Sequence, residues 1–319
     1  VEAGLNELGL RPQKIFDAEA DPGLGNGGLG RLASAFMDAM ASVGMAGNGN
    51  GIRYQYGLFK QAFVNGYQVE LPDDWMRNGF AWETRKENRA VTVKFGGWVE
   101  LRPSRSGNLR VIYHNTDDVL AVPYDVAMVG YHNQVVNNLR LWSAEAPINA
   151  GTDFTLEQKE VISQITRVLY PDDSDASGNQ LRLRQEYFFT SAGIQSIVRH
   201  YRRTHNSMAG FADRVAIHIN DTHPAMAIPE LMRVLMDDEH VSWDEAWRIT
   251  LKVMSYTNHT LLSEALEVWP IDMFSGMVPR IYQIIQEIDR RFRLVFVPQF
   301  GQAMIDRIAP LGNGQVRMA

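Results

Sequence analysis

The segment RVAIHINDTHP, Arg214–Pro224, decides the fold class that we predict for this chain. Its first part reads as a strand, because apolar residues alternate with the others along it. Asp221–His223 follow as a polar turn, and Pro224 stands where a helix can begin. A strand that passes through a polar turn into a helix is typical of α/β proteins. In open α/β sheets the turns at the carboxyl ends of strands line the ligand crevice, so we expect a site here.

Outward from this segment, the chain divides into a β-rich part and a helical part. Residues 89–145 contain runs of β-branched and aromatic residues bounded by turns, which predict strands. Helical periodicity follows, with a long helix over Leu181–His205 and a capped helix over Ser242–Tyr256. No linker is visible, so residues 1–319 are predicted to form one large α/β unit. Helices are expected on both faces of a mostly parallel sheet, to which residues 89–145 add strands that look antiparallel.

Composition excludes several classes of protein. The chain has 319 residues, 45% of them hydrophobic and 21% charged, with a net charge of −6 and no cysteine. Such a mixture is that of a folded globular protein rather than a disordered one. A mildly acidic chain is a poor general binder of nucleic acid, and no run reaches the roughly 18 apolar residues of a membrane helix. Without cysteine there is no disulfide, thiolate nucleophile or Cys metal site, and we expect a cytoplasmic location.

The densest glycine run is DPGLGNGGLGR, Asp21–Arg31. Its letters match the dinucleotide fingerprint, but that motif needs an apolar strand before it, and here DAEADP precedes it. The sequence therefore disfavours a nicotinamide dehydrogenase. What remains is a flexible turn that opens a helix, whose first N–H groups can bind an anion. A tight packing loop is the alternative.

A helix N-terminus is too weak to hold a phosphate by itself. It contributes roughly 0.3–1 kcal/mol, up to ~2 in a favourable site, whereas even millimolar affinity needs about 4 kcal/mol. The turn needs cationic side chains, and only Arg31 and Arg53 are close in sequence. We therefore interpret it as half of a site.

Two histidine segments are further candidates. His218, Asp221 and His223 resemble a metal-ligand spacing, but opposite strand parity and Pro224 argue against metal. Asp221 could instead orient His223 by accepting its ring N–H, with a core histidine as the alternative. YTNHT, residues 256–260, is expected at a helix end, where its uncharged donors and acceptors suit either sugar hydroxyls or a helix cap.

Two other polar features are ambiguous. YPDDSDASGN, residues 170–179, is either a mobile loop that gates a site or an ordinary surface loop. Glu264 and Glu267 follow YTNHT at i, i+3 spacing, and we expect them on a solvated helix face.

From about Leu5 to Ala319 the chain resembles the α-glucan phosphorylases, the glycogen and maltodextrin phosphorylase family. The resemblance lies in motifs that stand in family order: DPGLGNGGLGRLASAFMDAMASVGMAGNGNGIRYQYGLFKQ (21–61), LPDDW (71–75), PYD (123–125), NNLRLWSA (137–144), VLYPDD (168–173), LRLRQEYFF (181–189), INDTHPAMAIPELMR (219–233) and YTNHTLLSEALEVWP (256–270). So many ordered motifs are not a chance match.

The resemblance implies a fold and a reaction. The fold would be the Rossmann-like N-terminal half of a two-domain glycosyltransferase-B-type fold, without its C-terminal domain. The reaction would be phosphorolysis of an α-1,4-glucan such as glycogen or maltodextrin by inorganic phosphate, which releases α-glucose 1-phosphate. Pyridoxal phosphate would be the coenzyme, bound by a lysine of the C-terminal domain.

Site residues follow from the same motifs. Gly27, Gly28 and Leu29 match the turn that donates N–H groups to phosphate and contacts the sugar. His259 matches the histidine that bonds the glucosyl 6-hydroxyl. The remaining matches are Asp221 and His223 along the glucan approach and Asp173 and Ser174 in a gate loop.

The resemblance also implies what this chain lacks. The coenzyme lysine and the cations that hold substrate phosphate belong to the C-terminal domain, so we expect this chain alone to be inactive. A homodimer is a family expectation, weakened because the segment between Pro147 and Thr166 is short. Allosteric control is a further possibility within the family. The competing hypothesis from another class is a stand-alone carbohydrate-binding or regulatory module.

Overall fold

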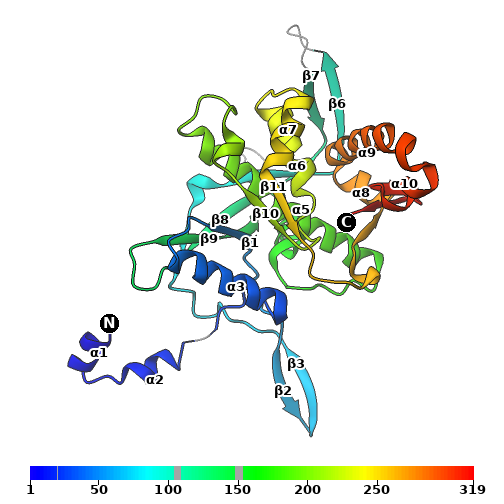
Figure 1. Cartoon of the computed structure of the whole chain (residues 1–319). Coiled ribbons are helices and arrows are strands. Elements are labelled where there is room, and N and C mark those ends of the chain that lie inside the picture. The colour runs from blue at the N-terminus through cyan, green and yellow to red at the C-terminus, as the bar shows by residue number, and fades with distance from the viewer. Residues whose placement is uncertain (20, 104–108, 148–153) are drawn as a thin grey trace.

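The computed structural model describes residues 1–19, 21–103, 109–147 and 154–319. Two short helices, α1 (Glu2–Glu7) and α2 (Pro12–Phe16), bury no side chain and lie apart from the body (Figure 1). Helix α3 (Gly27–Ser42) then begins inside the glycine run, as predicted.

A mixed sheet forms the centre of the β-rich part. Its strand order is β1-β9-β8-β4, with β5 also paired to β8. The strands are β1 (Asn48–Ile52), β4 (Glu83–Arg85), β5 (Val91–Phe95), β8 (Asp117–Val129) and β9 (Val136–Glu145). Only β1 and β9 run parallel within it, while the other described pairings are antiparallel. The sheet is therefore mixed rather than mostly parallel. The antiparallel strands expected within residues 89–145 form most of it, and β8 pairs with β9 because a short turn joins them.

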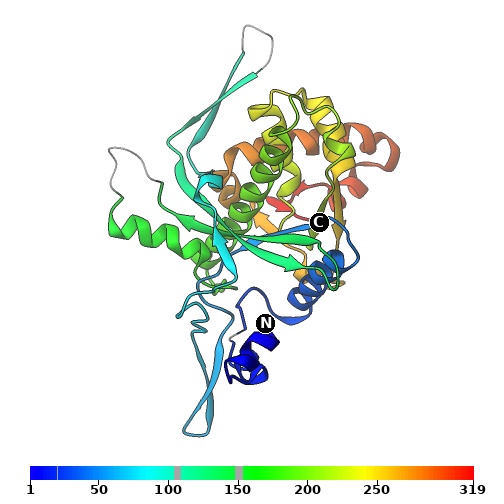
Figure 2. The same ribbon diagram turned by 90° about the vertical axis from the view of Figure 1, so that its left-hand side faces the viewer.

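Two hairpins project from the body in opposite directions (Figures 1 and 2). They are β2 (Lys60–Val64) with β3 (Tyr67–Leu71), and β6 (Trp98–Pro103) with β7 (Leu109–His114). Three short strands near the end of the chain form another small sheet, β12 (Val268–Pro270), β13 (Leu311–Gly312) and β14 (Gln315–Arg317).

The decisive segment forms a parallel β-α-β arrangement. Strand β10 (Ile217–Asn220) is followed by α6 (Ala227–Arg233), a π-helical turn over Val234–Asp238, α7 (Trp243–Val253) and strand β11 (Met254–Thr257). Strands β10 and β11 pair in parallel, Asn220 opposite Thr257. The predicted helix through Tyr256 was thus too long. At Met254 the backbone becomes extended and the helix ends, because pairing with β10 outweighs the helical preference of the sequence.

Helix α5 (Ala176–Arg202) joins the two apolar cores. Its middle, with Phe188, packs in the core over β5, β8 and β9, while its later part, with Val198, packs against α6 and α7. The remaining helices are α4 (Leu156–Ser163), α8 (Ile271–Met277), α9 (Pro279–Phe300), α10 (Gln302–Ile308) and short 3-10 turns at Glu87–Arg89, Gln164–Thr166, Phe211–Asp213 and Ser263–Ala265.

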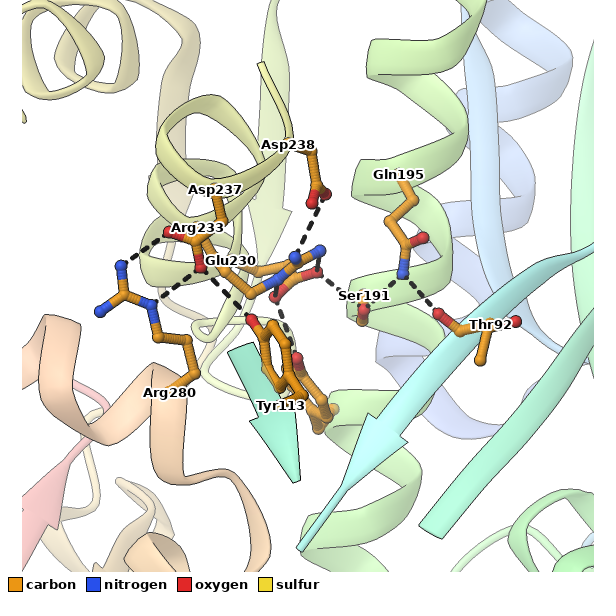
Figure 3. Close-up of polar contacts among 10 residues, drawn as sticks. Thr92, Tyr113, Ser191, Gln195, Glu230, Arg233, Asp237, Asp238 and Arg280 are labelled. Carbon is orange, nitrogen blue, oxygen red and sulfur yellow. Dashed lines mark hydrogen bonds and ion pairs between the residues drawn. The ribbon is translucent and has the colours of Figure 1, made fainter. Parts of the chain in front are cut away.

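A buried ionic network ties α5 to α6 (Figure 3). The Glu230 carboxylate, fully buried, accepts hydrogen bonds from Tyr187 Oη at 3.0 Å and Ser191 Oγ at 2.8 Å. It also accepts two from the Arg233 guanidinium, at 2.9 and 2.8 Å. Next to it, Arg280 of α9 forms a bidentate pair with Asp237 at 2.8 and 2.7 Å. These contacts hold α6 and the π-helical turn after it in place, and this segment is part of the connection between β10 and β11.

We predict that Glu230→Leu lowers the free energy of unfolding by about 3–5 kcal/mol, because among the described residues it leaves the buried Arg233 guanidinium with only the more exposed Asp238 carboxylate, at 3.2 Å. Urea-induced unfolding followed by circular dichroism measures the loss. Glu245→Leu is the matched control, since it removes a carboxylate from an exposed i, i+3 pair with Arg248 and should leave stability nearly unchanged. Equal stability of Glu230→Leu and wild type would contradict this reading of the network.

Candidate functional site

The carboxyl ends of β10 and β11 bring two of the predicted segments together. Asp221 N donates to Thr257 O at 2.9 Å, which extends the parallel pairing into the two turns. Across this junction His259 Nε2 lies 2.5 Å from Asn220 Oδ1. YTNHT was expected at a helix end, but it begins in a strand. His259 therefore lies at the edge formed by the carboxyl ends of β10 and β11, which we call the crevice, and α/β proteins bind ligands at such edges.

The contact with Asn220 sets the tautomer of His259. Because Asn220 contributes its carbonyl oxygen, His259 Nε2 must carry the hydrogen and donate it. Neutral His259 then presents Nδ1 as a hydrogen-bond acceptor. The residue is exposed, so this acceptor is suited to a hydroxyl group of a ligand.

Asp221 plays a different part from the one predicted. It is buried and has a positive φ of 69°, and its Oδ1 accepts the backbone N–H of Thr222 at 2.8 Å. This is the local turn that Asp tolerates well. Among the described residues no hydrogen bond joins Asp221 to His223, so the expected pairing is not found in this structure. His223 is half-buried and its charge interacts with the carboxyl group of Glu267.

Glu267 is a site residue that the sequence argument placed wrongly. It lies between the 3-10 turn and β12, and its side chain is 10% exposed rather than solvated on a helix. Thr222 Oγ1 donates to Glu267 Oε2 at 2.7 Å. Arg182 Nη2 donates to Glu267 Oε1 at 2.8 Å, and its Nη1 lies 3.2 Å from Asp173 Oδ2. The predicted gate loop is therefore joined to the crevice turn through Arg182 and Glu267.

The glycine turn is open, as its predicted role requires. Gly27 has a φ of 60°, and a Cβ atom added to Gly27 or Gly28 would meet nothing within 4 Å. In the described parts of the chain the N–H groups of Gly27, Gly28 and Leu29 have no hydrogen-bond partner, and the Asn26 side chain does not cap the helix. Such unpaired donors at a helix start are available to an anion.

The chain does not close these parts into one pocket. No described hydrogen bond or ion pair joins the glycine turn to His259 or Asp221. Two surface hollows, of about 500 and 360 Å³, lie elsewhere: one along α2 and the residues that flank it, the other beside Arg53 and Thr166. Among residues 1–19, 21–103, 109–147 and 154–319 no group of three His, Asp or Glu residues could hold a metal ion. No helix in those ranges is long and apolar enough to span a membrane.

We predict that neutral His259 is the Nε2–H tautomer and that Asn220→Leu shifts its tautomer population toward Nδ1–H, because the acceptor for Nε2–H is removed. Imidazole ¹⁵N chemical shifts measure both states. His205 is an internal reference for the Nδ1–H tautomer, since its Nδ1 lies 3.1 Å from the carbonyl oxygen of Tyr201 and donates to it. A dominant Nδ1–H form of His259 in the wild type would contradict the geometry.

Comparison with known proteins agrees with the motifs. The family model "Carbohydrate phosphorylase" matches residues 5–319. Glycogen phosphorylase of Bacillus subtilis is 49% identical over 321 residues, which cover 100% of this chain and 40% of the relative. Glycogen phosphorylase of Haemophilus influenzae is 48% identical, with 91% and 36% covered, and the human brain form is 45% identical, with 91% and 36% covered.

The chain thus spans about 40% or less of the length of these relatives. The match nevertheless extends over nearly all of its own residues, including the glycine turn, the gate loop, the crevice turn and YTNHT. The chain belongs to the carbohydrate phosphorylase family.

Proposed function

We propose that this chain is the glucan-side portion of an α-1,4-glucan phosphorylase. The complete protein would cleave glycogen or maltodextrin at the non-reducing end with inorganic phosphate and release α-glucose 1-phosphate. The observation that carries this proposal is the His259–Asn220 contact at the joined ends of β10 and β11, in a chain that matches the family over residues 5–319.

The chemistry of the crevice supports a sugar ligand. Asn220, Asn258 and His259 offer donors and acceptors without a fixed charge, and His259 Nδ1 is free to accept a hydrogen bond from a hydroxyl. Hydroxyl groups recognised this way give strong discrimination, because a sugar lacking one leaves a site group unpaired. Asp221 and His223 would line the path of the glucan chain.

The glycine turn supports an anionic partner beside the sugar. Its free N–H groups can stabilise charge on phosphate, but they supply only about 0.3–1 kcal/mol without cations. Arg53 does not supply the missing charge freely, since it pairs with Glu83 at 2.5 Å. Arg31, which is exposed on α3, can contribute one charge, and the further cations would come from outside this chain.

Pyridoxal phosphate, the coenzyme of this family, does not fit the described crevice by itself. Holding its aldehyde requires a lysine, and Asn220–His223 and Asn258–Thr260 contain none. In the complete protein the coenzyme would supply a phosphate group for proton transfer, bound largely by residues beyond this chain. A homodimer, a cytoplasmic location and allosteric control belong to the same proposal.

In the complete protein, His259→Ala should lower kcat/KM for phosphorolysis of maltodextrin by about 10–100-fold, which corresponds to the loss of one buried hydrogen bond worth about 1.5–3 kcal/mol. His240→Ala, at an exposed turn, is the control and should leave the rate unchanged. Unchanged kinetics of His259→Ala would remove this residue from the site.

The 319-residue chain alone should form no stoichiometric reducible adduct with pyridoxal phosphate and should not release glucose 1-phosphate, because in our proposal the coenzyme lysine and the cations that hold phosphate belong to the rest of the complete protein. Absorbance after borohydride treatment and a phosphorolysis assay test this. A stoichiometric adduct with activity would contradict the half-site model. Tight maltodextrin binding by a reading frame that stops at Ala319 would favour the stand-alone module instead.

A further inference from the structure

Arg182 is surrounded by three carboxyl groups at the junction of the gate loop and the crevice. Its guanidinium donates to Glu267 Oε1 from Nε at 3.2 Å and from Nη2 at 2.8 Å. Nη1 donates to Asp173 Oδ2 at 3.2 Å, and Nε lies 3.5 Å from Glu186 Oε1. One cation thus faces Glu267, Asp173 and Glu186, whose side chains are 10%, 50% and 6% exposed.

The exposure of the three carboxyl groups and the hydrogen bonds they accept indicate which of them is neutral. Asp173 is half-exposed and can be solvated as an anion. Glu267 receives two guanidinium hydrogen bonds and one from the Thr222 hydroxyl, which stabilise its charge. Glu186 receives no hydrogen bond from any N–H or O–H donor in the described residues, although both of its oxygens are buried. A second buried anion beside Glu267 would be uncompensated, and two carboxyl groups in one site share a proton.

The pKa directions agree with this assignment. Burial raises the pKa of Glu186 far above its usual range, and Glu267 raises it further, so that together they outweigh Arg182, which lowers it. Burial would also raise the pKa of Glu267, but the hydrogen bond with Glu186, the charge of His223, the Thr222 hydroxyl and Arg182 together lower it. The pKa of Glu186 is thus raised while that of Glu267 is lowered.

Other titratable groups face the same cluster. Tyr54, from the segment after β1, has a pKa raised chiefly by burial. Tyr170 stands at the start of the gate loop and His223 follows β10, beside Glu267. Arg182, on the same helix as Glu186, has a pKa that burial would lower but that the charge of Glu267 raises.

We propose that Glu186 is a protonated positioning residue. Its carboxyl O–H donates a hydrogen bond to Glu267, so that Arg182 can bind Glu267 and Asp173 at once. This arrangement fixes the loop 171–175 against the crevice turn at Thr222. Where the crevice takes a glucan, as proposed above, the position of this loop controls its approach. No bond to substrate is involved, since Glu186 acts through Glu267 and Arg182.

Infrared spectroscopy on the chain labelled with ¹³C-glutamate tests the proton directly. At neutral pH the wild type should show the carbonyl band of a protonated Glu side chain, and Glu186→Gln should lose it. Glu160→Gln, at an exposed pair with Arg167, should retain it. Absence of the band in the wild type, or its survival in Glu186→Gln, would overturn the proposal.

The pH dependence of stability has a definite sign. Folded Glu186 keeps its proton above pH 4.5, the ordinary Glu pKa, where the unfolded chain releases it. The folded state then binds more protons, so wild type loses stability relative to Glu186→Gln as pH rises from 4.5 to neutral. Urea midpoints of both proteins measure the difference. A difference that stays flat or changes in the opposite direction would contradict a protonated Glu186.

A nitroxide spin label measures the mobility of the loop 171–175 directly. The chain has no cysteine, so Ser174→Cys provides a single attachment point. Arg182→Gln should lose the immobilised component of the nitroxide spectrum, whereas Glu186→Gln should keep it, because the amide also donates to Glu267. Arg167→Gln is the control. An immobile label in Arg182→Gln, or a mobile one in Glu186→Gln, would overturn the proposal. None of these measurements uses glucan, so they can hold even if phosphorolysis is never found.

Discussion

The parallel pairing of β10 with β11 is the constraint on which the rest of the site depends. It aligns Asn220 with Thr257, and the two strands therefore end at the same edge. Every candidate group of the crevice follows one of these two ends. The buried Glu230–Arg233 pair and the Arg280–Asp237 pair fix the connecting helices. These buried ion pairs thus help to keep the polar turns after β10 and β11 aligned.

Several groups of the candidate site are open to solvent in the described structure. His259 is exposed, the N–H groups of the glycine turn are unpaired, and neither surface hollow includes them. Apolar residues of α3 agree with this picture: Phe36 is 57% exposed, while its neighbour Met37 is buried. A surface built this way is suited to contact with a further part of a larger protein. The coverage of about 40% of the relatives' length is consistent with such a part.

Sequence reasoning predicted element types well where one local pattern dominated. The helix at the glycine run, the strands between 89 and 145, and the long α5 were all confirmed. It failed where distant pairing decided the outcome, as at Met254, where the helix ends in a strand, and in the expectation that the sheet is mostly parallel, although the antiparallel strands within residues 89–145 were expected. The roles of Arg182 and Glu267 depend on contacts across 85 residues, which spacing does not reveal. The only local signal was the i, i+4 spacing of Arg182 and Glu186.

The central claim is that His259 Nδ1 accepts a sugar hydroxyl at this crevice. Its most direct test is the imidazole ¹⁵N shift of His259 in the complete protein on saturation with α-glucose 1-phosphate or with its 6-deoxy analogue. The account predicts a change at Nδ1 with the hydroxyl-bearing sugar and none with the analogue, while Nε2 stays bonded to Asn220. The same response to both sugars, or no response to either, would contradict it.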